Sequence, residues 1–207
     1  MSRRNAEALG AAFVVAASAF AFIARGVATR GTFAIDHRAR RFVRSRRRKA
    51  IDIAVKPVTV TALPLVAAVS TWTLAWALGR DRRRAAALAI GLTPFVAASA
   101  GQSFTTFLPQ RNPPGGVNEP SFPSGHTTGI TAESLTAAYV LRREGIAPAS
   151  TVAALVMWPL LTATTRLYRD RHWFTDILGG LAAGAAIACA MSATYELTSS
   201  RLDEATT

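Results

Sequence analysis

The sequence predicts an all-α protein, built as a six-helix transmembrane bundle with a basic interfacial segment between its first two helices. Three observations support this prediction. The chain has 207 residues, half of them hydrophobic, which suits a single domain over residues 1–207. Five long runs contain no charged residue. Eleven of the 24 lysines and arginines fall within residues 25–56.

The uncharged runs define most of the expected helices. They cover residues 8–24, 57–79, 85–110, 145–165 and 177–195. An apolar helix needs about 20 residues to cross a bilayer, so these runs are long enough. A sixth stretch, Thr127 to Leu141, has Glu133 as its one charged residue. We therefore expect helices at residues 7–25, 57–79, 85–106, 126–142, 147–166 and 175–197.

Two alternatives compete with this interpretation. Much of the apolar content is alanine, which is only weakly lipophilic, so a soluble alanine-rich bundle is the first. We favour the membrane, since repeated uncharged runs of this length are rarely needed in a small soluble bundle. The first run also resembles a signal peptide, with Arg3 and Arg4 ahead of it. A signal peptidase would be expected to cut at the small residues near Ala28, and Arg25 lies awkwardly close to that position, so we interpret the run as a retained span.

Residues 25–56 form the basic interfacial segment. A net charge of +12 would suit nucleic acid, but a cluster between two spans most simply lies against anionic headgroups, with Phe42 and Ile51 entering the interface. We expect the bilayer and no nucleic acid as partner. The single cysteine, Cys189, excludes an intrachain disulfide. The sequence does not determine the oligomeric state.

Proline and glycine mark how the later helices are arranged. Pro113, Pro114 and the pair Gly115–Gly116 break the chain ahead of the fourth helix. If six spans alternate in direction, the loops at 107–125 and 167–174 lie on the same side of the membrane. His126, which directly follows the first loop, and His172, in the second, can therefore meet. Glycines in the last helix are spaced for close helix packing, at positions 179, 180 and 184.

The first histidine motif is Pro123-Ser124-Gly125-His126. Ser124 is a good N-cap, Gly125 lets a ligand approach the backbone, and His126 opens a helix whose exposed N–H groups and dipole favour an anion. The alternative is an ordinary capped helix whose histidine faces water.

The second motif places Arg166, His172 and Asp176 in order along the chain. Asp176 can accept a hydrogen bond from one nitrogen of His172, which leaves the other free to attack phosphorus. Arg166 offers a fork of donors for phosphate oxygens. Alternatively, Asp176 only caps the final helix and Arg166 only contacts headgroups. The two motifs together predict phosphoryl transfer.

These motifs resemble those of the type 2 phosphatidic acid phosphatase family, and six spans over about 200 residues resemble its short bacterial members. The resemblance implies hydrolysis through a phosphohistidine without metal or cofactor. It implies catalytic roles for His172, His126 and Asp176. It implies substrate-binding roles for Arg166, Arg111, Ser124, Gly125 and Thr165.

The chain departs from the family pattern in its first motif. The family has a lysine, six residues and Arg-Pro, whereas no lysine precedes Arg111 in this part of the sequence. Asn112 separates Arg111 from Pro113. Thr165 stands where the family usually has a serine, and threonine also carries a hydroxyl.

The expected substrate is a phosphorylated membrane lipid. Resemblance to short bacterial members favours an undecaprenyl-type polyprenyl diphosphate, with phosphatidic acid or phosphatidylglycerol phosphate as alternatives. Two other classes are a catalytically weak lipid-binding relative and a soluble metal or vanadate-dependent protein. Resemblance also implies a multi-pass inner-membrane protein with an extracytoplasmic site. The basic residues oppose that orientation, since 15 would lie outside and nine inside.

Overall fold

The computed structural model describes residues 2–81, 83–108 and 110–204. All regular structure within these residues is helical, which confirms the all-α prediction, but there are eight helices where six were expected. They are α1 (Ser2–Ala28), α2 (Phe33–Arg44), α3 (Lys49–Thr61), α4 (Pro64–Arg80), α5 (Arg84–Phe107), α6 (Gly125–Arg143), α7 (Ala149–Tyr168) and α8 (Phe174–Glu204).

The additional helices come from the basic segment and from a break in the second predicted helix. The helix expected at residues 57–79 is divided, and α3 and α4 meet at a bend of 51°. Leu63 has extended backbone angles, φ −61 and ψ 136, because the ring of Pro64 disfavours helical geometry in the residue before it. Pro64 then occupies the first position of α4, where a missing N–H costs nothing.

By length and composition, three of the described helices can cross a membrane: α1, α5 and α8. The bent pair α3 and α4 makes a fourth if it counts as one broken span. The prediction of six spanning helices is therefore not confirmed. Helix α6 packs against α4, α5, α7 and α8. Because protein surrounds it, α6 buries threonines and Glu133 where a lipid-facing helix would carry apolar side chains.

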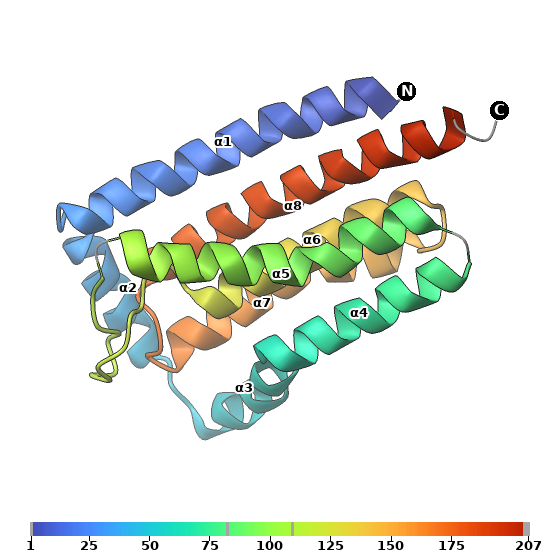
Figure 1. Ribbon diagram of the computed structural model, residues 1–207. Helices are drawn as coiled ribbons and strands as arrows, with labels where there is room; N and C mark the ends of the chain where they lie inside the picture. The colour runs from blue at the N-terminus through green and yellow to red at the C-terminus, as the bar shows by residue number, and fades with distance from the viewer. Residues whose placement is uncertain (1, 82, 109, 205–207) are drawn as a thin grey trace.

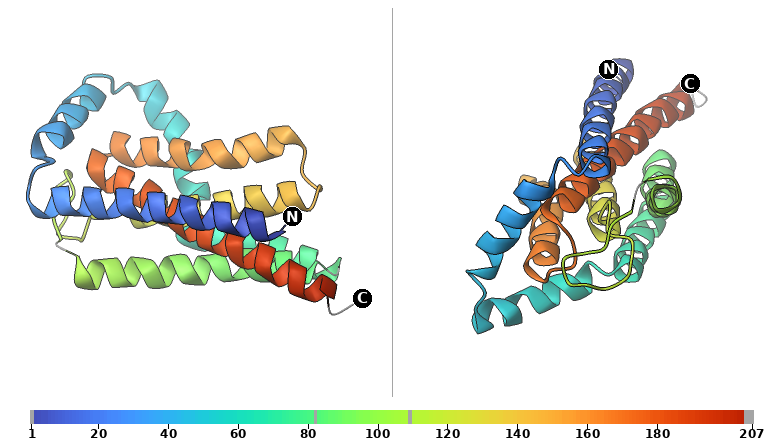
Figure 2. Two further views of the ribbon diagram at one scale, coloured as in Figure 1. Left: turned by 90° about the horizontal axis from the view of Figure 1, so that it is seen from above. Right: turned by 90° about the vertical axis from the view of Figure 1, so that its left-hand side faces the viewer.

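The long helices lie side by side, and α2, α3 and two loops gather at one end of the bundle (Figure 1). The chain termini lie at the opposite end, and the views at right angles agree (Figure 2). The starts of α6 and α8 lie at the end that holds α2 and α3. Both histidine motifs therefore reach the same end of the molecule.

Close packing of α6 on α8 brings the two motifs together. A Cβ at Gly184 would lie 2.5 Å from the Thr131 Cβ, and one at Gly180 would lie 2.9 Å from the Ser124 carbonyl oxygen. Real Cβ atoms do not approach so closely, so only glycine permits this packing. The expected packing role of these glycines is confirmed. At the helix starts, the Ser124 N–H donates to the Asp176 carbonyl oxygen over 3.0 Å.

Part of the basic segment binds the protein itself. Three arginines of residues 25–56 pair with the buried Asp170 in the loop before α8, at 3.0–3.1 Å: Arg40, Arg44 and Arg47. Other arginines of the segment are exposed, among them Arg38, Arg41 and Arg46. The apolar Phe42 is exposed beside them, as expected of a segment that meets headgroups. The segment thus anchors the loop that carries His172.

Candidate active site

The ring of His172 is held by a backbone carbonyl. Its Nδ1 lies 3.0 Å from the Ser121 carbonyl oxygen and 3.8 Å from Asp176 Oδ2. A carbonyl oxygen can only accept, so Nδ1 carries a proton, and in the neutral ring Nε2 keeps its lone pair. Sequence reasoning expected Asp176 to accept this bond and missed Ser121, because motif spacing says nothing about a carbonyl 51 residues away.

Asp176 is fully buried in the first turn of α8. Its Oδ1 accepts hydrogen bonds from Arg111 Nε and Nη2 over 3.0 and 2.6 Å. Its Oδ2 accepts from the Trp173 backbone N–H over 2.8 Å. Trp173 directly precedes the helix, so Asp176 is the third helical residue and reaches back to cap it. Asp176 thus combines a helix-capping contact with a position beside His172.

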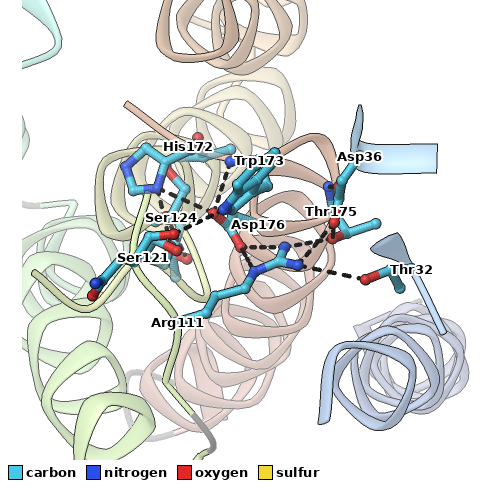
Figure 3. A network of polar contacts seen from close by, with 12 residues as sticks. Thr32, Asp36, Arg111, Ser121, Ser124, His172, Trp173, Thr175 and Asp176 are labelled. Atoms are coloured by element: carbon cyan, nitrogen blue, oxygen red, sulfur yellow. Dashed lines mark hydrogen bonds and ion pairs between the residues drawn. The ribbon is translucent and has the colours of Figure 1, made fainter. Parts of the chain in front are cut away.

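Arg111 lies between two carboxylates (Figure 3). Besides Asp176, it contacts Asp36 Oδ2 from Nη1 over 2.8 Å and Thr175 Oγ1 from Nη2 over 2.6 Å. All three guanidinium nitrogens therefore donate to protein groups. Its predicted contact with phosphate stays a prediction.

Sequence reasoning missed Asp36, one of only two acidic residues in the basic segment. It lies on α2 and is 2% exposed. One of its oxygens accepts from the Thr175 backbone N–H over 2.9 Å, and both accept from the Thr175 hydroxyl. A carboxylate here accepts from an N–H of the first turn of α8 that has no partner within the helix, and its negative charge interacts favourably with the helix dipole. No sequence motif signals this contact.

His126 lies in the first turn of α6, which is not among the candidate spans. Its buried Nε2 has no hydrogen-bond partner in the described part of the chain. Burial, and then the charges of Arg166, His172 and Arg171, lower the pKa of His126 to about 4. The ring of the ligand-free protein is therefore expected to be neutral at pH 7. Because the charge of protonated His172 contributes to this shift, the two rings lie within electrostatic range of each other.

Arg166, near the end of α7, is a buried cation for which the described part of the chain offers no counter-ion. It is 8% exposed, and its Nε has no partner among the residues that the structure describes. Burial, and then the charges of Arg169 and Arg171, lower the pKa of Arg166 to about 10, so it stays protonated at pH 7. A buried charge is stable only when it is paired, so this site favours an anion. Sequence reasoning missed the contribution of Arg171.

The remaining predicted site residues have distinct surroundings. Ser124 occupies the N-cap position of α6, but its oxygen accepts from the Thr127 hydroxyl over 3.0 Å and makes no capping bond. Gly125 is exposed and has open space where a side chain would stand. The Thr165 hydroxyl donates to the Thr162 carbonyl oxygen over 2.8 Å within α7. The predicted phosphate contacts of these residues stay predictions.

An apolar cavity of about 460 Å³ adjoins His126. Its walls come mainly from α4, α5 and α6. Gly125 and His126 line it, as does Glu133 two helical turns further along α6. Glu133 Oε2 accepts a hydrogen bond from the Thr71 hydroxyl over 2.6 Å. A mostly apolar cavity beside a neutral imidazole can accept a hydrocarbon chain whose polar end lies at His126.

The PAP2 superfamily model matches residues 60–199, two thirds of the chain. The chain belongs to the PAP2 superfamily. This confirms the resemblance to type 2 phosphatidic acid phosphatases that the two histidine motifs carry. No curated protein matches the sequence.

The PAP2 fold is also seen in a solved structure. It is the crystal structure of the first transmembrane PAP2-type phosphatidylglycerolphosphate phosphatase from Bacillus subtilis. The TM-score is 0.66 at 18% sequence identity, over 86% of this chain and 93% of that one. The residues that the family model matches, 60–199, include both histidine motifs and Arg111. Helices α1 and α2 of this PAP2 chain lie outside that range.

Proposed function

We propose that this PAP2 chain is a membrane lipid phosphatase that works through a phosphohistidine on His172. One observation carries the proposal: Arg166 and His126 present buried nitrogens that lack a partner among the described residues, and His172 lies within electrostatic range of His126. A phosphate group would supply the negative charge that Arg166 lacks. Family membership and the apolar candidate spans support a phosphatase that acts on lipid.

In the first step, the free Nε2 of His172 attacks phosphorus as the bond from phosphorus to the lipid oxygen breaks. The proton for that oxygen comes from His126. The charges that lower the pKa of His126 are positive, so a bound phosphate offsets them and favours its protonated form. A phosphate monoanion can itself bring the proton into the site. The products are phosphorylated His172 and the lipid without its terminal phosphate, which is a lipid monophosphate from a diphosphate and a lipid alcohol from a monoester.

In the second step, neutral His126 takes a proton from water as the water oxygen attacks phosphorus. The bond from phosphorus to His172 breaks, inorganic phosphate leaves together with the proton held by His126, and both rings return to their neutral state. Arg166, the Ser124 hydroxyl and the first-turn amides of α6 hold the phosphate oxygens. Arginine and amide donors supply the positive charge, so the proposal requires no metal ion or cofactor.

The apolar cavity favours a substrate with a hydrocarbon tail on the His126 side. That position directs the leaving oxygen towards the proposed acid and phosphorus towards His172. We propose an undecaprenyl-type polyprenyl diphosphate as first substrate, from the resemblance to short bacterial members. Phosphatidylglycerol phosphate is the second candidate, since the similar solved structure is described as a phosphatase of that lipid. Phosphatidic acid has the same reacting group.

We propose an inner-membrane location with the site on the extracytoplasmic face. The count of basic residues argues against this face, but three of those arginines, Arg40, Arg44 and Arg47, are paired with Asp170. Their charge is partly neutralised within the protein. A cysteine placed by Asn118→Cys in a Cys189→Ala background should react with an impermeant maleimide added to intact cells. Labelling only in inverted vesicles would reverse the orientation.

The function is tested by phosphate release from undecaprenyl diphosphate, phosphatidylglycerol phosphate and phosphatidic acid in detergent. His172→Ala should lose more than about a thousandfold in rate and should lose the acid-labile phosphoryl group trapped on the wild type. Glu196→Gln, a buried change at the far end of the bundle, is the control. Equal activity of wild type and His172→Ala would refute the mechanism. Lipid binding without turnover by the wild type would indicate the catalytically weak relative.

A further inference from the structure

A chain of ion pairs connects helix α2, in the basic segment, with the start of α8. Asp36 pairs with Arg111 over 2.8 Å, and Arg111 pairs with Asp176 over 2.6 Å. We propose that Asp36 and Arg111 are positioning residues, which orient Asp176 and through it His172. The proposal rests on the function proposed above, and it gives the basic segment a part in catalysis.

The contacts determine how the Asp176 carboxylate is rotated. Arg111 donates twice to Oδ1, and the Trp173 N–H donates to Oδ2. With both oxygens held, Oδ2 faces the Nδ1 side of the His172 ring at 3.8 Å. The Ser121 carbonyl holds the same nitrogen, and the Ser121 N–H donates to the Arg111 carbonyl oxygen over 3.1 Å. Arg111 thus controls both neighbours of the ring.

The charges explain why two carboxylates are needed. Arg111 alone would neutralise Asp176, whereas Asp36 and Asp176 together leave the three groups with one net negative charge. When Nε2 of His172 bonds to phosphorus, its ring becomes positively charged, and a nearby negative charge stabilises that state. Asp36 therefore preserves the electrostatic effect of Asp176 on the nucleophile.

The same contacts argue against Arg111 as a phosphate ligand. Each of its three guanidinium nitrogens already donates to Asp36, Asp176 or Thr175. Moving Arg111 to a phosphate would leave Asp36, which is 2% exposed, as a buried carboxylate without a cation. Helix α2 cannot easily move with Arg111, because the ion pairs of its Arg40 and Arg44 with Asp170 hold it against the loop before α8.

The test compares Asp36→Asn with Glu196→Gln. Both replace a carboxylate by an amide of the same shape, and both carboxylates are buried and bonded to one arginine, at opposite ends of the bundle. The substrate is dioctanoyl phosphatidic acid in detergent, and orthovanadate serves as a transition-state mimic that bonds to the nucleophile. Thermal unfolding is followed in parallel.

For Asp36→Asn we expect kcat to fall roughly tenfold to hundredfold, with KM within about threefold of wild type. Orthovanadate inhibition should weaken in proportion to kcat. Glu196→Gln should lose thermal stability and keep kcat. Equal kcat in both variants would overturn the proposal, because Asp36 would then serve only the fold.

Arg111→Lys separates positioning from substrate binding, since lysine keeps the charge but loses the fork of donors. We expect its kcat to fall with little change in KM. A rise in KM at unchanged kcat would make Arg111 a phosphate ligand and overturn the proposal. If wild type releases no phosphate from any lipid but binds orthovanadate more tightly than Asp36→Asn does, the proposed function fails and the positioning role stands.

Discussion

The two ends of the bundle differ in how completely their buried charges are paired. At the far end, Glu196 is 1% exposed and accepts hydrogen bonds from Arg143 over 2.6 Å and from the Tyr139 hydroxyl over 2.8 Å. Glu144 pairs with Arg83 there and accepts from Tyr195. These charges are balanced by partners within the protein, and they join α5, α6 and α8.

At the site end, balance is incomplete. Asp36, Arg111 and Asp176 satisfy one another, but Arg166 and His126 present buried nitrogens without partners in the described chain. The contrast teaches that burial of charge alone does not mark a functional site. The informative feature is a buried cation left without an anion, since folding gains nothing from that arrangement.

Among the tests of this contrast, the largest effect is expected at Arg166. Arg166→Gln should lower kcat/KM roughly hundredfold to thousandfold, because it removes the buried cation that faces the phosphate. Phosphate release from dioctanoyl phosphatidic acid measures the loss. Arg143→Gln, which removes the arginine that pairs with Glu196, is the control and should keep its activity. Similar losses in both variants would erase the distinction between the two ends.

A smaller effect is expected on stability at the far end. Glu196→Gln should destabilise the protein by about 1–3 kcal/mol, because it weakens a buried carboxylate that Arg143 and Tyr139 both contact. The midpoint of thermal unfolding in detergent measures this change. Arg166→Gln should leave that midpoint unchanged or raise it, since it removes an unpaired buried charge. A lower midpoint for Arg166→Gln would indicate that Arg166 stabilises the fold.

The smallest effect concerns the titration of His126. Its pKa of about 4 is due first to burial and then to Arg166, so the ring should be neutral at pH 6 in the free protein. Arg166→Gln removes one positive charge and should raise the pKa part of the way towards 6.5. Orthovanadate should raise it too. Histidine NMR, with His126→Gln for assignment, measures both shifts, and a downward shift would contradict the assigned cause.

The sequence predicted the uninterrupted helices well, but it did not predict the bend between α3 and α4. The third expected helix, residues 85–106, is observed as Arg84–Phe107, because a long uncharged run bounded by arginines and a proline-rich loop has clear ends. The run at residues 57–79 is equally apolar but bends before Pro64. Hydropathy does not register a backbone break, whereas the pyrrolidine ring imposes one. The roles of the eight predicted site residues stay predictions, and for Arg111 we propose positioning of Asp176 in place of phosphate binding.

The sequence by itself determined the helical class, the two histidine motifs and the glycines that let α6 approach α8, because these depend on residue type and short spacing. Only the tertiary structure decided the partners: His172 bonds to the Ser121 carbonyl, and Arg111 lies between Asp36 and Asp176. Such pairings join residues up to 75 positions apart. They depend on how the helices and loops pack, which no local spacing specifies.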